Sequence, residues 1–261
     1  MDQLKILHDG TYEIDAGAYC GVVPKALWSK YFNDSNNKLR LSLNIPFIDT
    51  EKHKFILDSG MGNTFSDNFI KNFKPDKKYD LLNELKRHGV KKLDYVIISH
   101  LHFDHSGYAF SKNELFKNTK IIVQNNEIKA FRNPNEFTRG SYLKHRIYKN
   151  MNGIDGTKKI NSNISVIFTG GHTEGHQAII VSIGSKKYLY GGDLFPSAFH
   201  IKPYYLTAID SYPISSLRMK KKLLKKAINE HMIMIFNHDN KLPLAEISGN
   251  INKPELNPVD F

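Results

Sequence analysis

The sequence predicts an α/β protein in which helices cover two β-sheets. Strand-like apolar runs dominate both halves of the 261-residue chain, and helix-like segments separate them. Hydrophobic residues make up 40% of the chain, an ordinary globular composition with enough length for a sizeable core. We find no long linker, repeat or low-complexity tract, and we therefore expect one domain over residues 1–261.

The first half contains three predicted strands and one clear helix. Two apolar runs, 41–49 and 53–58, flank a short turn-like segment and predict a pair of strands. Apolar residues at helical spacing predict a helix over 79–89, which ends in a glycine. A buried strand is expected over 93–99.

The second half repeats the alternation of strands and helices. A polar stretch over 125–152 is expected to be partly helical, and 215–230 reads as an amphipathic helix. The predicted strands cover 120–124, 164–170, 177–183, 187–193 and 231–237.

The net charge of +11 raises the question of a nucleic-acid partner. The basic residues are spread along the chain, however, and the one cluster, 218–227, looks like the solvated face of the helix just described. We find no module that combines basic and aromatic residues, so nucleic acid is not the expected partner.

Other bulk features bear on the compartment. No apolar run approaches the roughly 18 residues that a membrane span requires, so no membrane partner is expected. The N-terminal MDQLKILHDG lacks a signal pattern, which predicts a cytoplasmic location. Cys20 is the single cysteine, so an intrachain disulfide is impossible.

The segment VIISHLHFDH, residues 96–105, places four titratable side chains directly after an apolar strand. They are His100, His102, Asp104 and His105. Burying so many polar groups without a partner costs several kcal/mol, on the order of 2–7 for each group. Imidazole and carboxylate are ligands that suit zinc, so we interpret the cluster as metal ligands.

Three later strands end in the same way. His172 follows ISVIFTGG, Asp193 ends KYLYGGD, and His238 follows HMIMIFN. Ligands at the ends of neighbouring strands can converge on one rim of a sheet, where α/β proteins place their active sites.

Together these residues provide five imidazoles and two carboxylates, enough for two metal ions. His172 can join His100 and His102 at one metal, and His238 can join Asp104 and His105 at the other. Asp193 can bridge the two sites. Two metals about 3.5–4 Å apart can share a hydroxide, activate it at neutral pH and polarise a carbonyl. Zinc is the expected metal, with manganese, cobalt and ferrous iron as alternatives.

These motifs resemble those of a known family. SHLHFDHSG (99–107) resembles the HxHxDH signature of the metallo-β-lactamase superfamily, GGHTEGHQ (170–177) its TPGHTPGHQ element, and ILDSG (56–60) its LIDTG turn. The resemblance implies an αββα four-layer sandwich with a two-metal site, usually zinc, and the same assignment of ligands. It also implies that Asp58 holds a ligand by a hydrogen bond.

Further segments are similar to one branch of that superfamily, the quorum-quenching N-acyl homoserine lactonases. They are GVVPKALW (21–28), residues 125–143, GGDLFPSAFH (191–200), IDSYP (209–213) and FNHDN (236–240). The resemblance implies a hydrolase in which a hydroxide bridging two metals opens an ester-type carbonyl, above all a lactone. Asp104 would orient the nucleophile and pass a proton to the leaving group.

One position departs from that branch. The well-studied lactonases carry a tyrosine three residues after the bridging aspartate, where it contacts the substrate carbonyl, and this chain has Pro196 there. We expect another donor, with His200 as the catalytic candidate. The tyrosine alternatives are Tyr142, Tyr204 and Tyr205.

Alternatives to a lactone remain open. The same chemistry suits a thioesterase resembling glyoxalase II, an arylesterase or a phosphodiesterase. A nucleic-acid-processing enzyme and a metal-binding protein without catalysis are further hypotheses. The family resemblance also implies a homodimer, in which residues 17–28 could form an interface or a lip over the pocket.

Overall fold

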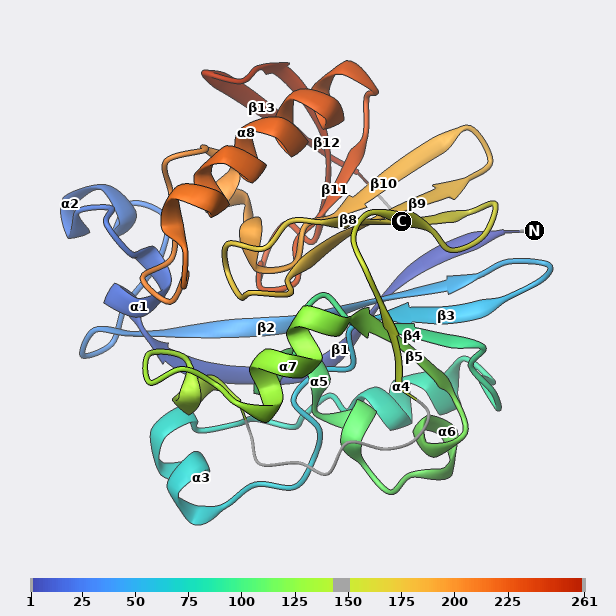
Figure 1. The fold of residues 1–261 in the computed structure, drawn as a ribbon. Coiled ribbons are helices and arrows are strands. Elements are labelled where there is room, and N and C mark those ends of the chain that lie inside the picture. The colour runs from blue at the N-terminus through green and yellow to red at the C-terminus, as the bar shows by residue number, and fades with distance from the viewer. Residues whose placement is uncertain (1, 143–150, 260–261) are drawn as a thin grey trace.

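The computed structural model describes residues 2–142 and 151–259, and two β-sheets lie face to face at its centre (Figure 1). The first sheet has six strands in the order β1-β2-β3-β4-β5-β6. They are β1 (Gln3–Asp15), β2 (Lys38–Asp49), β3 (Lys54–Leu57), β4 (Tyr95–Ile97), β5 (Lys120–Gln124) and β6 (Met151–Ile154). β1, β2 and β3 pair antiparallel, whereas β3 to β6 pair parallel.

The second sheet has seven strands in the order β13-β12-β11-β10-β9-β8-β7. They are β7 (Lys158–Lys159), β8 (Ile164–Phe168), β9 (Gln177–Ile183), β10 (Lys186–Tyr190), β11 (Ile233–Ile235), β12 (Leu244–Asn250) and β13 (Lys253–Pro258). Only the β10–β11 pair is parallel among these described strands.

Helices lie on the outer faces of both sheets. α4 (Leu81–Arg87), α6 (Glu114–Lys117) and α7 (Asn125–Arg132) pack on the first sheet, and α8 (Pro213–Asn229) packs on the second. The remaining α-helices are α1 (Ala16–Cys20), α2 (Lys25–Trp28), α3 (Asp67–Phe73) and α5 (Phe103–Ser106). Short 3₁₀ helices cover Tyr108–Phe110, Arg139–Ser141, Gly192–Leu194 and Ala198–Ile201. The order of layers is therefore helix, sheet, sheet, helix, which confirms the predicted αββα sandwich.

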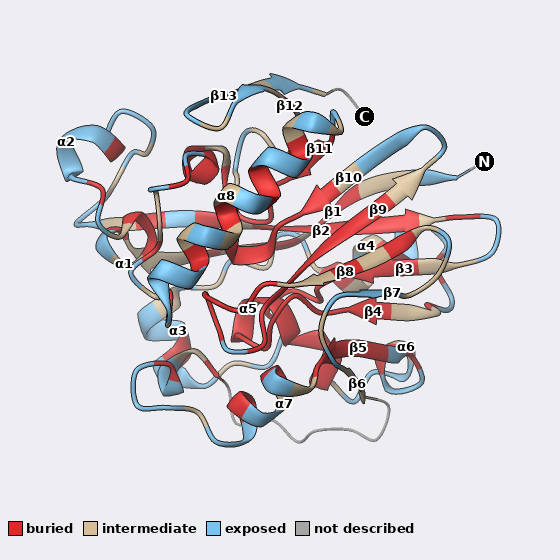
Figure 2. Cartoon of the chain, turned by 45° about the horizontal axis from the view of Figure 1, so that its top comes forward, coloured by how far each residue is buried: buried red, intermediate tan, exposed pale blue. Residues whose placement is uncertain are grey.

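The central strands are apolar on both faces because both faces are covered (Figure 2). In β5, Ile122 packs between the sheets, whereas Ile121 and Val123 pack under the helices. In β9, Ile179 faces the other sheet and Ile180 faces α8. Burial on both sides explains why these strands could be predicted from unbroken apolar runs.

Several predicted boundaries shift. The strands expected over 93–99 and 187–193 end at Ile97 and Tyr190, so the candidate ligands that follow lie in loops and short helices rather than in strands. The predictions over 120–124 and 177–183 are confirmed to the residue. The part of the 125–152 stretch at 143–150 lies outside the described residues.

The predicted solvated helix, α8, needs one correction. Most of its basic residues do lie on the exposed face, but Lys220 is buried together with Leu223 and Leu224. The Lys220 ammonium donates to the backbone carbonyls of His200 (2.8 Å) and Tyr205 (2.6 Å). No helix among the described residues is long and apolar enough to cross a membrane.

Candidate metal centre

The first four candidate ligands lie in the segment that follows β4. The chain leaves the sheet after Ile97 and runs as a loop to His102, which is the N-cap residue (φ −63°, ψ 157°) of the short helix α5. Asp104 and His105 therefore project from a helical turn, whereas His100 and His102 project from the loop before it. Because the backbone changes direction at His102, the side chains of this one segment reach two neighbouring groups of candidate ligands.

The other three candidates come from the second sheet. His172 lies in the turn between β8 and β9, Asp193 in the 3₁₀ helix after β10, and His238 in the loop after β11. Gly192 has φ +50°, and an added Cβ would lie 2.7 Å from His176 Nε2. Glycine is thus required beside Asp193 by both conformation and space.

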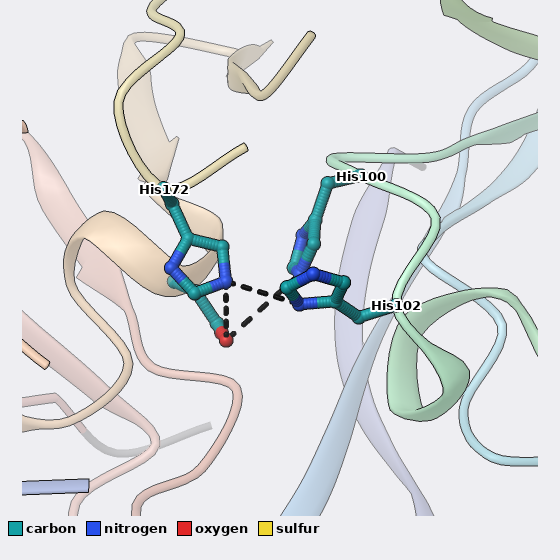
Figure 3. Close-up of side chains that lie close together, drawn as sticks. His100, His102 and His172 are labelled. Atoms are coloured by element: carbon teal, nitrogen blue, oxygen red, sulfur yellow. Dashed lines mark hydrogen bonds and ion pairs between the residues drawn. The ribbon is translucent and has the colours of Figure 1, made fainter. Parts of the chain in front are cut away.

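His100, His102, His172 and Asp193 form what we call the first cluster. Their ligand atoms all lie within 4.8 Å of one another, and every member is buried. Figure 3 shows the rings of the three histidines turned toward one point. His172 Nε2 lies 3.2 Å from His102 Nδ1 and 3.4 Å from Asp193 Oδ2.

Asp104, His105 and His238 form the second cluster, and their ligand atoms also lie within 4.8 Å of one another. His238 Nε2 lies 3.4 Å from Asp104 Oδ2, and His105 Nε2 lies 3.7 Å from the same oxygen. Asp193 touches both clusters. Its Oδ1 lies 3.2 Å from His105 Nε2 and 3.3 Å from His238 Nε2, whereas its Oδ2 faces the first cluster.

The donor atoms fit a pair of divalent metals. Three of the histidines donate their Nδ1–H to the protein: His105 to Asp58 (2.6 Å), His172 to Asp210 (2.8 Å) and His238 to the Ser42 carbonyl (2.9 Å). These bonds fix the tautomer and leave the Nε2 lone pair directed inward, as metal-binding histidines require.

The unpaired atoms support the same fit. The Nε2 atoms of His100, His105 and His238 are buried without a hydrogen-bond partner among the described residues, and His102 turns its Nδ1 toward the first cluster. Buried polar atoms normally find partners, so three such nitrogens at the two clusters indicate that cations are their partners.

The electrostatics of the clusters are those of ligands without their metals. Burial and the neighbouring histidines hold the pKa of His100 and of His102 well below the usual value, so both rings are neutral and ready to coordinate. Burial also opposes a charge on His105, but the surrounding carboxylates outweigh it and raise the pKa of His105 well above its usual value. In the same way, the charges of His105 and His238 overcome burial and hold the pKa of Asp193 well below its usual range.

Asp58 hydrogen-bonds to the candidate ligand His105 and to two residues near it. It accepts hydrogen bonds from His105, from the backbone N–H and hydroxyl of Ser99 (2.6 and 2.7 Å) and from the Tyr190 hydroxyl (2.6 Å). Its φ of +61° is uncommon for a residue other than glycine, and backbone strain of this kind clusters at functional sites. Asp58 thus makes the kind of contact that the sequence predicted for it.

A pocket of about 410 Å³ opens beside the two clusters. Asp104, Asp193 and His102 are among the residues that line it. Its apolar lining consists of Ile14, Ala18, Phe73, Phe103 and Ile209, and its polar lining of Tyr12, Glu13, Asp15, Lys38, Asn72 and Ser141, with Gly140. A substrate with an apolar arm can therefore reach the carboxylates.

Tyr12 was not among the predicted site residues. Its hydroxyl donates to Asp104 Oδ2 over 2.6 Å, and its buried ring packs edge-on against Phe103 and His238. Burial, with Asp104 and Asp193 nearby, raises the pKa of Tyr12 well above its usual value, so the phenol stays protonated and donates. No motif surrounds Tyr12 in the sequence, so no local signal identifies it.

Glu127 was also missed. It lies in the first turn of α7, which follows β5 directly, and it is fully buried against both loops of the first cluster. The signal was present, because Glu127 follows an apolar strand in the same way as the predicted ligands do.

The structure places His200 away from the pocket. Its Nε2–H donates to the Tyr19 carbonyl (3.0 Å) and its Nδ1 accepts from the Ser197 hydroxyl (2.8 Å). Burial lowers the pKa of His200 to about 3, so the ring is neutral. With both nitrogens engaged and no place in the pocket lining, His200 is placed to support the Tyr19 backbone rather than to donate to a substrate.

The alternative tyrosines do not reach the clusters with a free hydroxyl. Tyr204 is 58% exposed, Tyr205 packs on Phe199, and the Tyr142 hydroxyl donates to Glu127 (3.0 Å). Tyr12, by contrast, lines the pocket and donates its hydroxyl to Asp104.

Comparison with known proteins agrees with this geometry. The sequence profile of the metallo-beta-lactamase superfamily matches residues 41–232. An N-acyl homoserine lactonase of Bacillus thuringiensis is 29% identical over 216 residues, which cover 76% of this chain and 82% of the relative.

Two solved structures extend the comparison. A probable metal-dependent hydrolase from Staphylococcus aureus superposes with a TM-score of 0.91 at 27% identity, over 100% of this chain and 98% of its own. An N-acyl homoserine lactone hydrolase, whose product N-hexanoyl-L-homoserine is bound at its catalytic metal centre, gives a TM-score of 0.73 at 25% identity, over 91% and 93% of the two chains. The chain described here belongs to the metallo-β-lactamase superfamily.

Proposed function

We propose that this protein is a two-metal hydrolase that opens lactones, with N-acyl homoserine lactones as the substrate class. The observation that carries the proposal is Asp193, whose two oxygens face two separate sets of inward-directed imidazoles. The lactone class is supported by the names of the relatives. It is also supported by the apolar residues that line the pocket beside Asp104.

The seven predicted ligands divide between the metals as the two clusters do. We assign His100, His102 and His172 to one metal and Asp104, His105 and His238 to the other, with Asp193 shared. When bound, two such ions supply a nucleophilic hydroxide at neutral pH and polarise the carbonyl oxygen. We propose zinc, because three imidazoles with carboxylate oxygen are typical zinc ligands.

The residues around the metals then carry the rest of the reaction. Hydrolysis adds water across the ester bond: the bond from the carbonyl carbon to the ring oxygen breaks, and the departing alkoxide takes a proton. Asp104 lines the pocket and is placed to move that proton. Tyr12 donates to Asp104 Oδ2, the oxygen that also faces His105 and His238, and so orients this carboxylate.

The pocket wall orients the substrate. Phe73, Phe103 and Ile209 offer apolar surface beside the carboxylates, which suits an acyl chain. Lys38 and Asn72 line the same pocket and suit the polar amide and ring groups of such a substrate. The single domain, the homodimer and the cytoplasmic location stay predictions.

The test is hydrolysis by protein loaded with zinc, manganese or cobalt, measured as acid release from acyl lactones of several chain lengths. Thioester, aryl ester and phosphodiester substrates are run in parallel, with metal-stripped protein as the control. Turnover of the lactones in preference to the others is the expected result. If no acyl lactone is turned over above the stripped control, the lactonase proposal is wrong, and preferential turnover of another class identifies the alternative hydrolase.

A further inference from the structure

Glu127 is a buried carboxylate that lies outside both clusters. It is in the first turn of α7, and its side chain is inaccessible to solvent. Burial raises the pKa of Glu127, while hydrogen bonds from neighbouring groups oppose the rise. A buried carboxylate is costly, so its partners indicate what it does.

Both oxygens of Glu127 are fully used. Oε1 accepts from the Leu101 N–H (2.9 Å) and from the Tyr142 hydroxyl (3.0 Å). Oε2 accepts from the Thr173 hydroxyl (2.6 Å) and from the Gly175 N–H (3.0 Å). Four donors therefore converge on one carboxylate from three separate segments of the chain.

Three of the four donors are adjacent to a histidine of the first cluster, and the fourth, Gly175, lies three residues after His172. Leu101 lies between His100 and His102 in the chain, and Thr173 directly follows His172. The Tyr142 ring packs edge-on against His102, with 5.0 Å between ring centroids. Glu127 thus joins the loop from the first sheet to the loop from the second sheet at the point where both present histidines.

The second cluster has different supports. His105 is held by Asp58, Asp104 by Tyr12, and His238 by the Ser42 carbonyl. None of the hydrogen bonds described for Glu127 reaches these residues. The hydrogen bonds of Glu127 therefore reach only the loops of the first cluster, whereas the Ser99 hydroxyl lies close to both clusters, 3.1 Å from His100 Nδ1 and 3.4 Å from His105 Nδ1.

The packing around Glu127 leaves little room for rearrangement. A Cβ added at Gly175 would lie 2.1 Å from the Glu127 backbone nitrogen. The loop that carries Gly175 therefore approaches the backbone of α7 closely, and the Glu127 carboxylate lies between this loop and the loop that carries Leu101.

We propose that Glu127 is a positioning residue for the first cluster: it holds the His100–His102 and His172–Gly175 loops in register, so that the three histidines converge before a metal binds. The inference rests on the proposed metal centre, and it adds that Glu127 supports one of the two metal sites and not the other. Loss of such outer contacts typically lowers metal affinity by about 10- to 100-fold.

The test uses Glu127→Gln and the metal-free full-length protein. The variant keeps the shape but turns an amide N–H₂ toward two of the donors. Cobalt and zinc titrations, followed by cobalt absorption and by calorimetry, give the two binding constants. We expect one equivalent to weaken by about 10- to 100-fold and the other to stay within about twofold of the original protein.

Hydrogen exchange of the metal-free protein gives an independent readout. We expect the amides of Leu101 and Gly175 to lose protection in Glu127→Gln, because both donate to the carboxylate. Asp9→Asn is the matched control, since Asp9 is an equally buried carboxylate that accepts from backbone N–H groups elsewhere, at Met61 and Leu81. It should leave both metal affinities and these two amides unchanged.

Thr173→Val serves if Glu127→Gln does not fold, because it removes a single 2.6 Å bond without adding a donor. It should weaken the same equivalent by a smaller factor of about 3- to 10-fold. The inference would be overturned if Glu127→Gln weakened the binding of both metal equivalents equally. It would also be overturned if both metal affinities and the exchange protection of the Leu101 and Gly175 amides stayed as in the unmodified protein. An original protein that binds fewer than two metals would refute the proposed function, and the exchange data would still decide whether Glu127 holds the loops.

Discussion

Replacing Tyr12 with phenylalanine removes one hydroxyl and keeps the ring that packs on Phe103 and His238. The hydroxyl donates to Asp104 over 2.6 Å inside the protein. A hydrogen bond to a charged group contributes about 1.5–3 kcal/mol. If that bond orients Asp104 during the reaction, kcat should fall by about 10- to 100-fold, since each decade of rate corresponds to about 1.4 kcal/mol.

The assay that isolates this role compares leaving groups. A carboxylate that returns a proton matters most when the leaving alkoxide is strongly basic. Tyr12→Phe should therefore slow alkyl lactones far more than aryl esters, with KM nearly unchanged. Bound metal is counted in each preparation, so that loss of metal is not mistaken for loss of proton transfer.

Tyr19→Phe is the matched control. Tyr19 is a buried tyrosine whose ring lies 6.5 Å from that of His238, and its hydroxyl makes no hydrogen bond to a candidate ligand among the described residues. Its variant should keep kcat within about twofold, because no bond to a candidate ligand is lost. An equal fall for alkyl and aryl substrates in Tyr12→Phe, or no fall, would refute the role assigned to Tyr12.

Other predictions address the supports of the centre and the stability of the fold. Asp210→Asn should weaken one metal by about tenfold in a zinc titration, because Asp210 accepts the Nδ1–H of His172. Gly192→Ala should lower the unfolding free energy by more than about 2 kcal/mol in urea, because the residue needs φ +50° and its Cβ would lie 2.7 Å from His176. Burial lowers the pKa of Lys220 from 10.5 to about 7, so the unfolded chain binds more protons than the folded one between these values. The unfolding free energy should then rise from pH 7 toward pH 10, by up to about 5 kcal/mol from this group, and Lys220→Met should flatten the rise in urea titrations at several pH values. Chelation should lower the melting temperature and abolish hydrolysis, and zinc should restore both; an unchanged melting temperature would contradict the assigned ligands.

The strands that were predicted best from the sequence are those that are buried on both faces. Ile121, Ile122 and Val123 are all buried, so a plain apolar run is enough to identify β5. β1 was not predicted as a strand, because a register shift between His8 and Thr11 breaks its alternation. β12 and β13 were not predicted, and β13 is a polar edge strand defined by its pairing with β12 rather than by its own composition.

The candidate ligands were predictable for a local reason, whereas their supports were not. Each ligand follows an apolar run, and that pattern is visible within about ten residues. Tyr12 and Asp104 are 92 residues apart, and Asp210 is 38 residues from His172. Such pairs depend on how the sheets stack, which no short pattern encodes.

His200 shows the limit of proximity along the chain. It lies seven positions after Asp193, which suggested that its ring faces the metals. The 3₁₀ helix Ala198–Ile201 instead turns the ring toward the Tyr19 carbonyl. Direction of a side chain after a turn depends on backbone angles that the residue spacing does not reveal.

The stacking of the two sheets also decides how the two clusters face each other. The candidate ligands after β4 follow a strand of the first sheet, whereas His172, Asp193 and His238 follow strands of the second, so each cluster contains residues from both. The geometry of both clusters therefore depends on the apolar layer between the sheets, where Leu57 and Ile97 pack with residues of the second sheet. Because protein interiors are close-packed, a change of volume in that layer shifts one half of each cluster against the other. Metal affinity should thus respond to substitutions in the layer between the sheets that leave every ligand in place, and the two-metal centre is a property of the whole sandwich rather than of one loop.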